Sequence, residues 1–479
     1  MNLKKSFQVL QQFSAFLLVG TVFALVWANL NFDAYDAFVN GRLWDPASLK
    51  VAMDEGSIFA KIYQWLAYWL AHDPALPDAI AAWNPKDHGG NEAHHFSFHF
   101  IVNDLFMVLF FGIAAKEVSE SFLPGGPLSS VSKASMPAVA TLGGVLGPIA
   151  AFFIFKAILN PSPDITVAWA VPTATDIAYC WLFAQIIFGR SHPAVTFLLV
   201  LAVLDDLIGM MIIAVFYTET VHFQWLGLVV GAIVLCEIMR RMGVKSFWPY
   251  ILIGGPMCWF GLHNTGVHAA LALVPVIPFM PHGGRDHGLF VRADEAQAHH
   301  DEEGEPHDAH AHGHHDDTMN AFEHFFKPIV DVGLLTFGLA NAGVVLSGAA
   351  FTGAPTWIIF CSLLFGKTIG ILFFAVVGTK MGLSLPKPMN LKQVVVLGCV
   401  AGIGFTVALF VTTVATGDNL VLKAAGVDGM LKLGALLSFG AGPIALIMSK
   451  AMGLKKINTP EELAAAVAEV DAQDAKGAA

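Results

Sequence analysis

Long apolar stretches recur along almost all of this sequence, and they limit the possible folds more than any other feature. A helix that crosses the hydrocarbon core of a bilayer needs about 20 mostly apolar residues, and twelve segments approach that length. They comprise residues 11–30, 98–116, 134–158, 165–188, 193–217, 222–240, 247–262, 265–280, 325–348, 355–379, 391–416 and 429–452. The sequence therefore predicts an all-α polytopic membrane protein with about twelve transmembrane helices.

The composition excludes several other classes of protein. Only 13% of the 479 residues are charged, whereas soluble domains contain about 25%, so a soluble enzyme and a disordered scaffold are excluded. The formal net charge of −11 argues against a nucleic-acid partner. The five cysteines lie apart in apolar stretches and are interpreted as small buried side chains, not as disulfide or zinc ligands. No cofactor is implied.

The distribution of lysine and arginine orients the predicted bundle. If the N-terminus is cytoplasmic, sixteen of these residues lie on the cytoplasmic side and six on the other side. This positive-inside bias predicts that both termini are cytoplasmic. The predicted organisation is an N-terminus with the first helix (1–30), an extracytoplasmic loop (31–97), helices two to eight (98–280), a His-rich cytoplasmic loop (281–322), helices nine to twelve (323–453) and a cytoplasmic tail (454–479).

Two segments outside the predicted spans have distinctive compositions. Residues 57–72 are rich in Trp and Tyr and predict an amphipathic helix. This helix lies either at the membrane interface or against the bundle or a partner subunit. Residues 281–317 interleave histidines with acidic residues and are interpreted as a solvated linker, with metal capture or pH sensing as the alternatives.

Adjacent acidic residues in the fifth span are the clearest candidates for a functional site. Ionisable groups inside a span cost about 2.5–3.5 kcal/mol or more, yet Asp205 and Asp206 lie together in its middle. Two carboxylates this close do not both ionise cheaply. The pair therefore predicts a site where a cation and protons compete. The alternative is a buried pair held by structural partners.

The fourth span contains a sequence that interrupts a helix. Pro172 removes an amide donor, and Thr173, Thr175 and Asp176 follow it. Unwound backbone inside a membrane is tolerated only beside a cavity. A plain proline kink, with the threonines bonded to backbone, is the alternative.

The eleventh span contains a corresponding interruption. Gly402 and Gly404 permit unwinding or close helix contact, and Phe405 and Thr406 follow them. The fourth span is the middle member of spans three to five, and the eleventh is the middle member of spans ten to twelve. Interrupted helices at matching places in two halves indicate an inverted-repeat core with a site near the midplane.

A lysine lies midway along the tenth span. Lys367 needs a carboxylate partner there, and Asp205 or Asp206 is the obvious candidate. Snorkelling to the interface is the alternative.

Six short motifs support a family resemblance. They are TATDIA, LDDLIG, GVHAALA, LANAGV, GKTIGI and GIGFT, in this order. In these motifs the chain resembles the NhaA family of bacterial sodium/proton antiporters. The resemblance implies an inverted-repeat fold with two discontinuous helices. The resemblance covers roughly residues 10–30 and 98–453.

The resemblance implies a role for each of the matching residues. Asp205 and Asp206 would bind sodium and protons, with Asp206 as the primary metal ligand. Thr175 and Asp176 would lie at the crossing of the unwound helices, where Asp176 would balance their dipoles. Lys367 would pair with Asp205 and be released or deprotonated during exchange. The stretch 402–406 would form the second unwound segment.

The resemblance also implies pH sensing, with some departures. Glu117, Glu323 and His324 match family positions tied to pH sensing, although ordinary interfacial charges would give the same pattern. Ser121 and Lys327 stand where the family has an acidic residue and a histidine. The long segment 31–97 replaces a short hairpin used for dimer contact, and the His-rich loop is an insertion.

These observations predict an electrogenic antiporter that exports sodium, or lithium, in exchange for protons and is regulated by pH. By resemblance it would be a homodimer in the bacterial inner membrane. A sodium-coupled organic anion symporter of the same fold is the alternative. An intramembrane aspartyl protease would need a Gly-x-Gly-Asp motif, and the glycine motif here ends in Phe405.

Overall fold

A computed structural model of the chain describes residues 15–41, 97–123, 131–218, 221–281, 318–417 and 419–477, with residues 43, 61, 126 and 128. Every regular element in these ranges is an α-, 3-10 or π-helix, so the predicted all-α class is confirmed. The predicted helix at 57–72 and the His-rich loop lie almost wholly outside the described residues.

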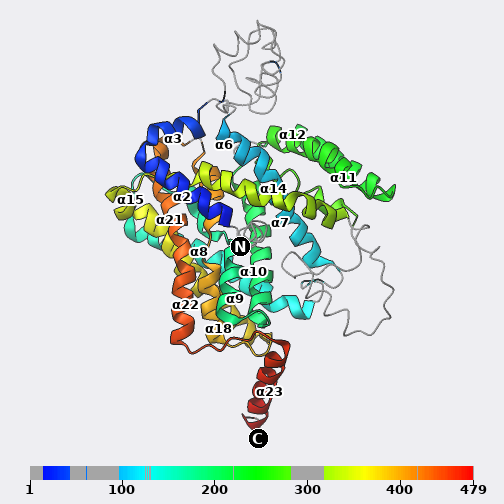
Figure 1. Cartoon of the computed structure of the whole chain (residues 1–479), viewed down its shortest axis with the longest axis vertical. Helices are drawn as coiled ribbons and strands as arrows, with labels where there is room; N and C mark the ends of the chain where they lie inside the picture. The colour runs from blue at the N-terminus through cyan, green and yellow to red at the C-terminus, as the bar shows by residue number, and fades with distance from the viewer. Residues whose placement is uncertain are drawn as a thin grey trace, which may run out of the picture.

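The elements before residue 281 form the first half of the bundle (Figure 1). They are α2 (Ala15–Leu30), α3 (Phe32–Val39), α6 (Phe98–Phe100), η2 (Ile101–Phe106), α7 (Met107–Phe122), α8 (Val131–Leu159), η3 (Thr166–Thr173), α9 (Ile177–Phe188), α10 (Pro193–Phe216), α11 (Phe223–Arg241), η4 (Tyr250–Gly254), α12 (Gly255–Thr265), η5 (Ala269–Leu271) and η6 (Ile277–Phe279).

The elements after residue 317 form the second half and end in a helix that projects from the bundle (Figure 1). They are α14 (Thr318–Asn341), α15 (Gly348–Thr352), α16 (Ala354–Cys361), η7 (Ser362–Gly366), α17 (Lys367–Lys380), α18 (Leu391–Ala401), α19 (Phe405–Thr416), α20 (Leu420–Ala424), α21 (Val427–Leu437), η8 (Ser438–Gly440), α22 (Ala441–Ala451) and α23 (Pro460–Gly477).

Eight of the predicted spans correspond to candidate membrane spans in the described residues. Six continuous helical segments are long and apolar enough to cross a membrane. They are Phe98–Phe122, Ala134–Leu159, Pro193–Phe216, Phe223–Arg241, Ala354–Lys380 and Val427–Ala451. Two more are bent pairs, η3 with α9 and α18 with α19. The first predicted span is the shorter apolar helix α2, the seventh is η4 with α12, and the ninth is α14, which begins at Thr318.

The eighth predicted span, 265–280, is not a continuous helix. Gly266 ends α12 with a φ of +93°, and turns with two short 3-10 segments follow. Pro275 and Pro278 lack the amide hydrogens that a regular helix would use. Residues 269–273 are buried inside the bundle. This segment is therefore apolar because it packs against other helices.

Glycines allow α8 and α17 to pack with their backbones in contact. A Cβ atom at Gly370 would lie 2.1 Å from the Gly143 carbonyl oxygen, and one at Gly147 would lie 2.3 Å from the Gly366 carbonyl oxygen. Both helices thus carry small residues four positions apart, the spacing that brings membrane helices close together. Lys367, the first residue of α17, lies between Gly366 at the end of η7 and Gly370 of α17, so this contact positions its backbone beside α8.

Candidate ion-binding site at the crossing of two broken helices

The two bent pairs are interrupted where the sequence predicts it. Residues 174–176 separate η3 from α9 at a bend of 43°, and residues 402–404 separate α18 from α19 at a bend of 49°. A Cβ atom at Gly402 would lie 2.8 Å from the Leu363 carbonyl oxygen, and one at Gly404 would lie 3.2 Å from the Ala174 carbonyl oxygen. Neighbouring backbone therefore approaches Gly402 too closely for a side chain and leaves little room for one at Gly404.

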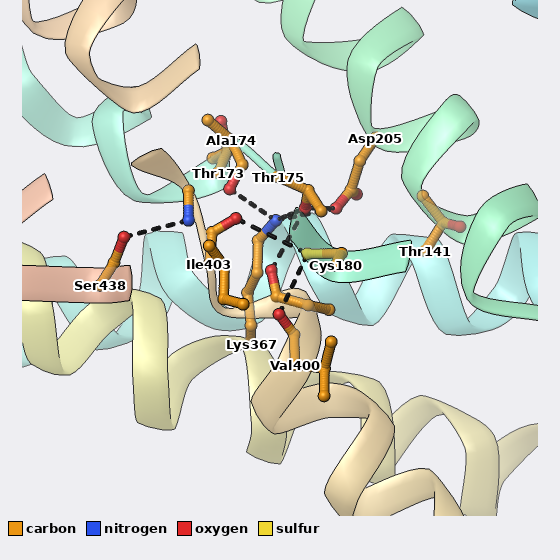
Figure 2. A network of polar contacts seen from close by, with 12 residues as sticks. Thr141, Thr173, Ala174, Thr175, Cys180, Asp205, Lys367, Val400, Ile403 and Ser438 are labelled. Atoms are coloured by element: carbon orange, nitrogen blue, oxygen red, sulfur yellow. Dashed lines mark hydrogen bonds and ion pairs between the residues drawn. The ribbon is translucent and has the colours of Figure 1, made fainter. Parts of the chain in front are cut away.

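The two interruptions are hydrogen-bonded to each other. The Asp176 amide donates to the Ile403 carbonyl oxygen at 2.7 Å, and the Thr175 hydroxyl oxygen lies 3.4 Å from the Ala401 carbonyl oxygen. The Cys180 thiol lies 3.1 Å from the Val400 carbonyl oxygen (Figure 2). Backbone groups of the first interruption are thus hydrogen-bonded to the other broken helix. Such bonds are needed because the hydrocarbon core offers no water to replace them.

One carboxylate caps the first turns of both broken helices. Asp176 Oδ1 accepts from the Tyr179 amide of α9 at 3.3 Å. Its Oδ2 accepts from the Thr406 amide of α19 at 3.1 Å and from the Thr406 hydroxyl. Helix N-termini carry partial positive charge, and the Asp176 carboxyl group lies at two of them.

Lys367 forms an ion pair with Asp205. Its Nζ lies 2.8 Å from Asp205 Oδ2, and neither side chain is exposed. The ammonium also donates to the Ala174 carbonyl oxygen at 2.9 Å and to the Thr175 hydroxyl. The Thr175 hydroxyl in turn donates to Asp205 Oδ2 at 2.7 Å. Figure 2 shows Lys367, Thr175 and Asp205 pointing toward one another at the first interruption.

The aspartate pair retains oxygen atoms with unused capacity. Within the described residues, the Oδ1 atoms of Asp205 and Asp206 are buried without a hydrogen-bond partner. A Cβ atom at Gly144 of α8 would lie 3.4 Å from Asp205 Oδ1. Sequence reasoning missed Gly144, although it lies in the same glycine-rich stretch of the third span as Gly143 and Gly147. Carboxylate oxygens of this kind can serve as ligands to an alkali cation.

The other residues predicted for the crossing have packing roles. Pro172 and Thr173 are buried at the end of η3, where the Thr173 hydroxyl donates to the Ala170 carbonyl oxygen at 2.7 Å. Phe405 packs edge-on against Tyr179, with ring centroids 5.6 Å apart. These residues shape the interruptions. Within the described part of the chain, none of their oxygen atoms is hydrogen-bonded to Asp205 or Asp206.

The pH-sensor candidates are not all brought together. Lys116 of α7 is almost fully buried and pairs with Glu323 of α14 at 2.6 Å and with Glu120. Glu117 is partly buried next to this pair, whereas His324 is exposed. Lys116, the centre of this network, was not among the residues predicted from the sequence. Its apolar neighbours on α7 are the signal that could have indicated its burial.

A helical bundle with several membrane spans, in which two broken helices cross beside the buried carboxyl group of Asp205, defines a membrane transporter of the broken-helix class. Comparison with known proteins then assigns the family. The chain belongs to the Na+/H+ antiporter 1 family, which matches residues 52–446.

Relatives from several bacteria cover nearly the whole chain. The protein named Na(+)/H(+) antiporter NhaA in Geobacter sulfurreducens is 40% identical over 458 residues, covering 95% of this chain and 100% of the relative. A relative of the same name from Geotalea uraniireducens is 40% identical over 455 residues, covering 94% and 98%. The one from Jannaschia is 36% identical over 468 residues, covering 93% and 97%.

Proposed function

We propose that this chain exchanges sodium for protons and that Asp205 and Asp206 hold either a sodium ion or protons, never both together. The observation that carries this proposal is the pair of buried carboxylate oxygens without partners beside two crossed, broken helices. Asp206 is the primary ligand because its carboxylate has no ion-pair partner among the described residues. Asp205 and the Thr175 hydroxyl complete the set. Lithium is the second substrate.

Lys367 competes with the cation for Asp205. The ammonium occupies Asp205 Oδ2 together with Thr175, so a sodium ion that uses this oxygen must displace it. Protons return to the carboxylates, or to one carboxylate and Lys367, when sodium leaves. Two groups therefore change protonation for each sodium ion, and the exchange moves net charge.

The exchange requires that the site open to one side of the membrane at a time. The broken-helix bundle rocks against the remaining helices, with the site near its centre. An inward proton gradient across the bacterial inner membrane then drives sodium out of the cell. Both termini are cytoplasmic in this arrangement, and the protein works as a homodimer.

Substitution of Asp206 by asparagine tests the proposal. In proteoliposomes, the wild-type chain should show sodium- and lithium-dependent proton flux, and Asp206→Asn should reduce it at least about 100-fold, since an amide neither holds the charge nor exchanges the proton. Asp164→Asn is the matched control, because Asp164 is exposed and pairs only with Lys156 and Thr166. Normal flux in folded Asp206→Asn would contradict the proposed ligand. Sodium uptake that depends on an organic anion would indicate a symporter.

Regulation by pH is proposed to involve the Lys116 network. Glu323→Gln removes one of the two carboxylates that pair with Lys116. With one negative charge removed, the remaining carboxyl groups near Lys116 lose their protons at lower pH. The pH at which flux is half-maximal should therefore fall by about one unit. His324→Ala should leave this pH unchanged, because His324 is exposed. Equal shifts in the two variants, measured in proteoliposomes across several pH values, would contradict this assignment.

A further inference from the structure

The last candidate span is interrupted beside the crossing by a short 3-10 turn. Helices α21 and α22 are joined through η8, which begins at Ser438. The α22 helix packs closely on the first broken helix, since a Cβ atom at Gly442 would lie 2.4 Å from the Phe183 ring. Its Ala441 carbonyl oxygen also lies 3.5 Å from the Cys399 thiol of α18. This turn is therefore in contact with both broken helices.

Ser438 caps the start of the second broken helix. Its Oγ accepts from the Gly404 amide at 3.1 Å and from the Phe405 amide at 3.4 Å. The hydroxyl hydrogen is used within its own helix, where it donates to the Ala435 carbonyl oxygen at 2.6 Å. Ser438 is fully buried. The serine oxygen is thus held with its lone pairs toward the first amides of α19.

Ser438 and Asp176 divide the amides of this helix start. The neutral hydroxyl takes Gly404 and Phe405, and the carboxylate takes the next residue, Thr406. Without the hydroxyl, two buried amides would lack an acceptor, which is costly away from water. The Asp176 carboxyl group already accepts from Thr406 at this helix start, so it would be drawn toward α19.

An aromatic contact reinforces the same arrangement. The Phe439 ring follows Ser438 and packs edge-on against Tyr179 of α9, with centroids 5.2 Å apart. It also packs against Phe405 of α19 at 5.7 Å. Such ring pairs favour defined geometries. The turn η8 therefore joins the starts of both broken helices through one hydroxyl and one ring.

We propose that Ser438 is a positioning residue for cation binding. This inference rests on the proposed sodium site. Asp176 follows Thr175 directly in the chain, and the Thr175 hydroxyl donates to Asp205 Oδ2. A displacement of the Asp176 carboxylate toward α19 therefore moves the hydroxyl that orients Asp205. The consequence is weaker cation binding with little change in the maximal rate.

The test compares Ser438→Ala with Ser438→Thr in proteoliposomes, using sodium and lithium at several pH values. Ser438→Ala should raise the KM for both cations about three- to tenfold, which corresponds to the loss of ordinary buried hydrogen bonds. Ser438→Thr keeps the hydroxyl and should recover most of the affinity. Ser449→Ala is the matched control, because this serine lies in the same span and, among the residues that the structure describes, its hydroxyl bonds only to the Leu446 carbonyl oxygen.

The outcomes separate this inference from the proposed function. If the wild-type chain shows no sodium-driven proton flux, the proposed function is wrong. If the wild type transports sodium but Ser438→Ala has a normal KM, the positioning role is wrong. Equal impairment of Ser438→Ala and Ser438→Thr, with lowered melting temperatures in both, would also overturn it, since side-chain volume alone would then explain the effect.

Discussion

Replacement of Lys367 by methionine is expected to lower the free energy of unfolding by about 3–5 kcal/mol and to stop sodium-driven proton flux. The Lys367–Asp205 pair is fully buried, so loss of the ammonium leaves a carboxylate without its charge partner. Thr175 alone remains to donate to Asp205 Oδ2. The melting temperature of the purified protein in detergent and flux in proteoliposomes measure the two effects.

The double variant Asp205→Asn/Lys367→Met separates stability from transport. Removing both charges together is often neutral or stabilising, because neither group is then buried unpaired. We therefore expect the melting temperature to return close to that of the wild type while flux remains absent. Recovery of flux in the double variant would show that the ion pair has only a structural role. Equal instability in the single and double variants would show that the pair does not stabilise the fold.

Gly370→Ala is expected to destabilise the bundle by about 3 kcal/mol, the upper part of the range for an added methyl group. The new Cβ atom would meet the Gly143 carbonyl oxygen at 2.1 Å. Backbone lies on both sides of this contact, so no flexible side chain can move away. Separation of α8 from α17 would also displace Lys367 from Asp205, and flux should fall with the melting temperature.

Gly227→Ala is the control for this prediction. Gly227 lies in α11, and a Cβ atom there would have no neighbour within 4 Å. The melting temperature of this variant should be no lower than that of the wild type. The added methyl group meets no other atom, and alanine favours a helix more than glycine does. A Gly370→Ala variant as stable and active as Gly227→Ala would contradict the proposed contact between α8 and α17.

Several parts of this molecule could be predicted from local sequence. Apolar length indicated the eight candidate spans, since a bilayer demands a long uninterrupted stretch. The Pro172 and glycine motifs predicted the two interruptions. The apolar length rule failed at residues 265–280, where two prolines and burial inside the bundle produce turns. Composition alone does not distinguish a segment that faces lipid from one that packs against protein.

The partners of the buried charges were decided only by the tertiary structure. From the residues alone, Lys367 could pair with Asp205 or Asp206, and the resemblance implied Asp205. The tertiary structure places Lys367 against Asp205, which lies 162 positions away. Thr406 reaches Asp176 across 230 positions, and Lys116 reaches Glu323 across 207. The amino-acid sequence by itself determined the helices, their interruptions and the ionisable groups within them, because these depend on neighbours along the chain. The pairing of those groups depends on how helices cross, which no local pattern specifies.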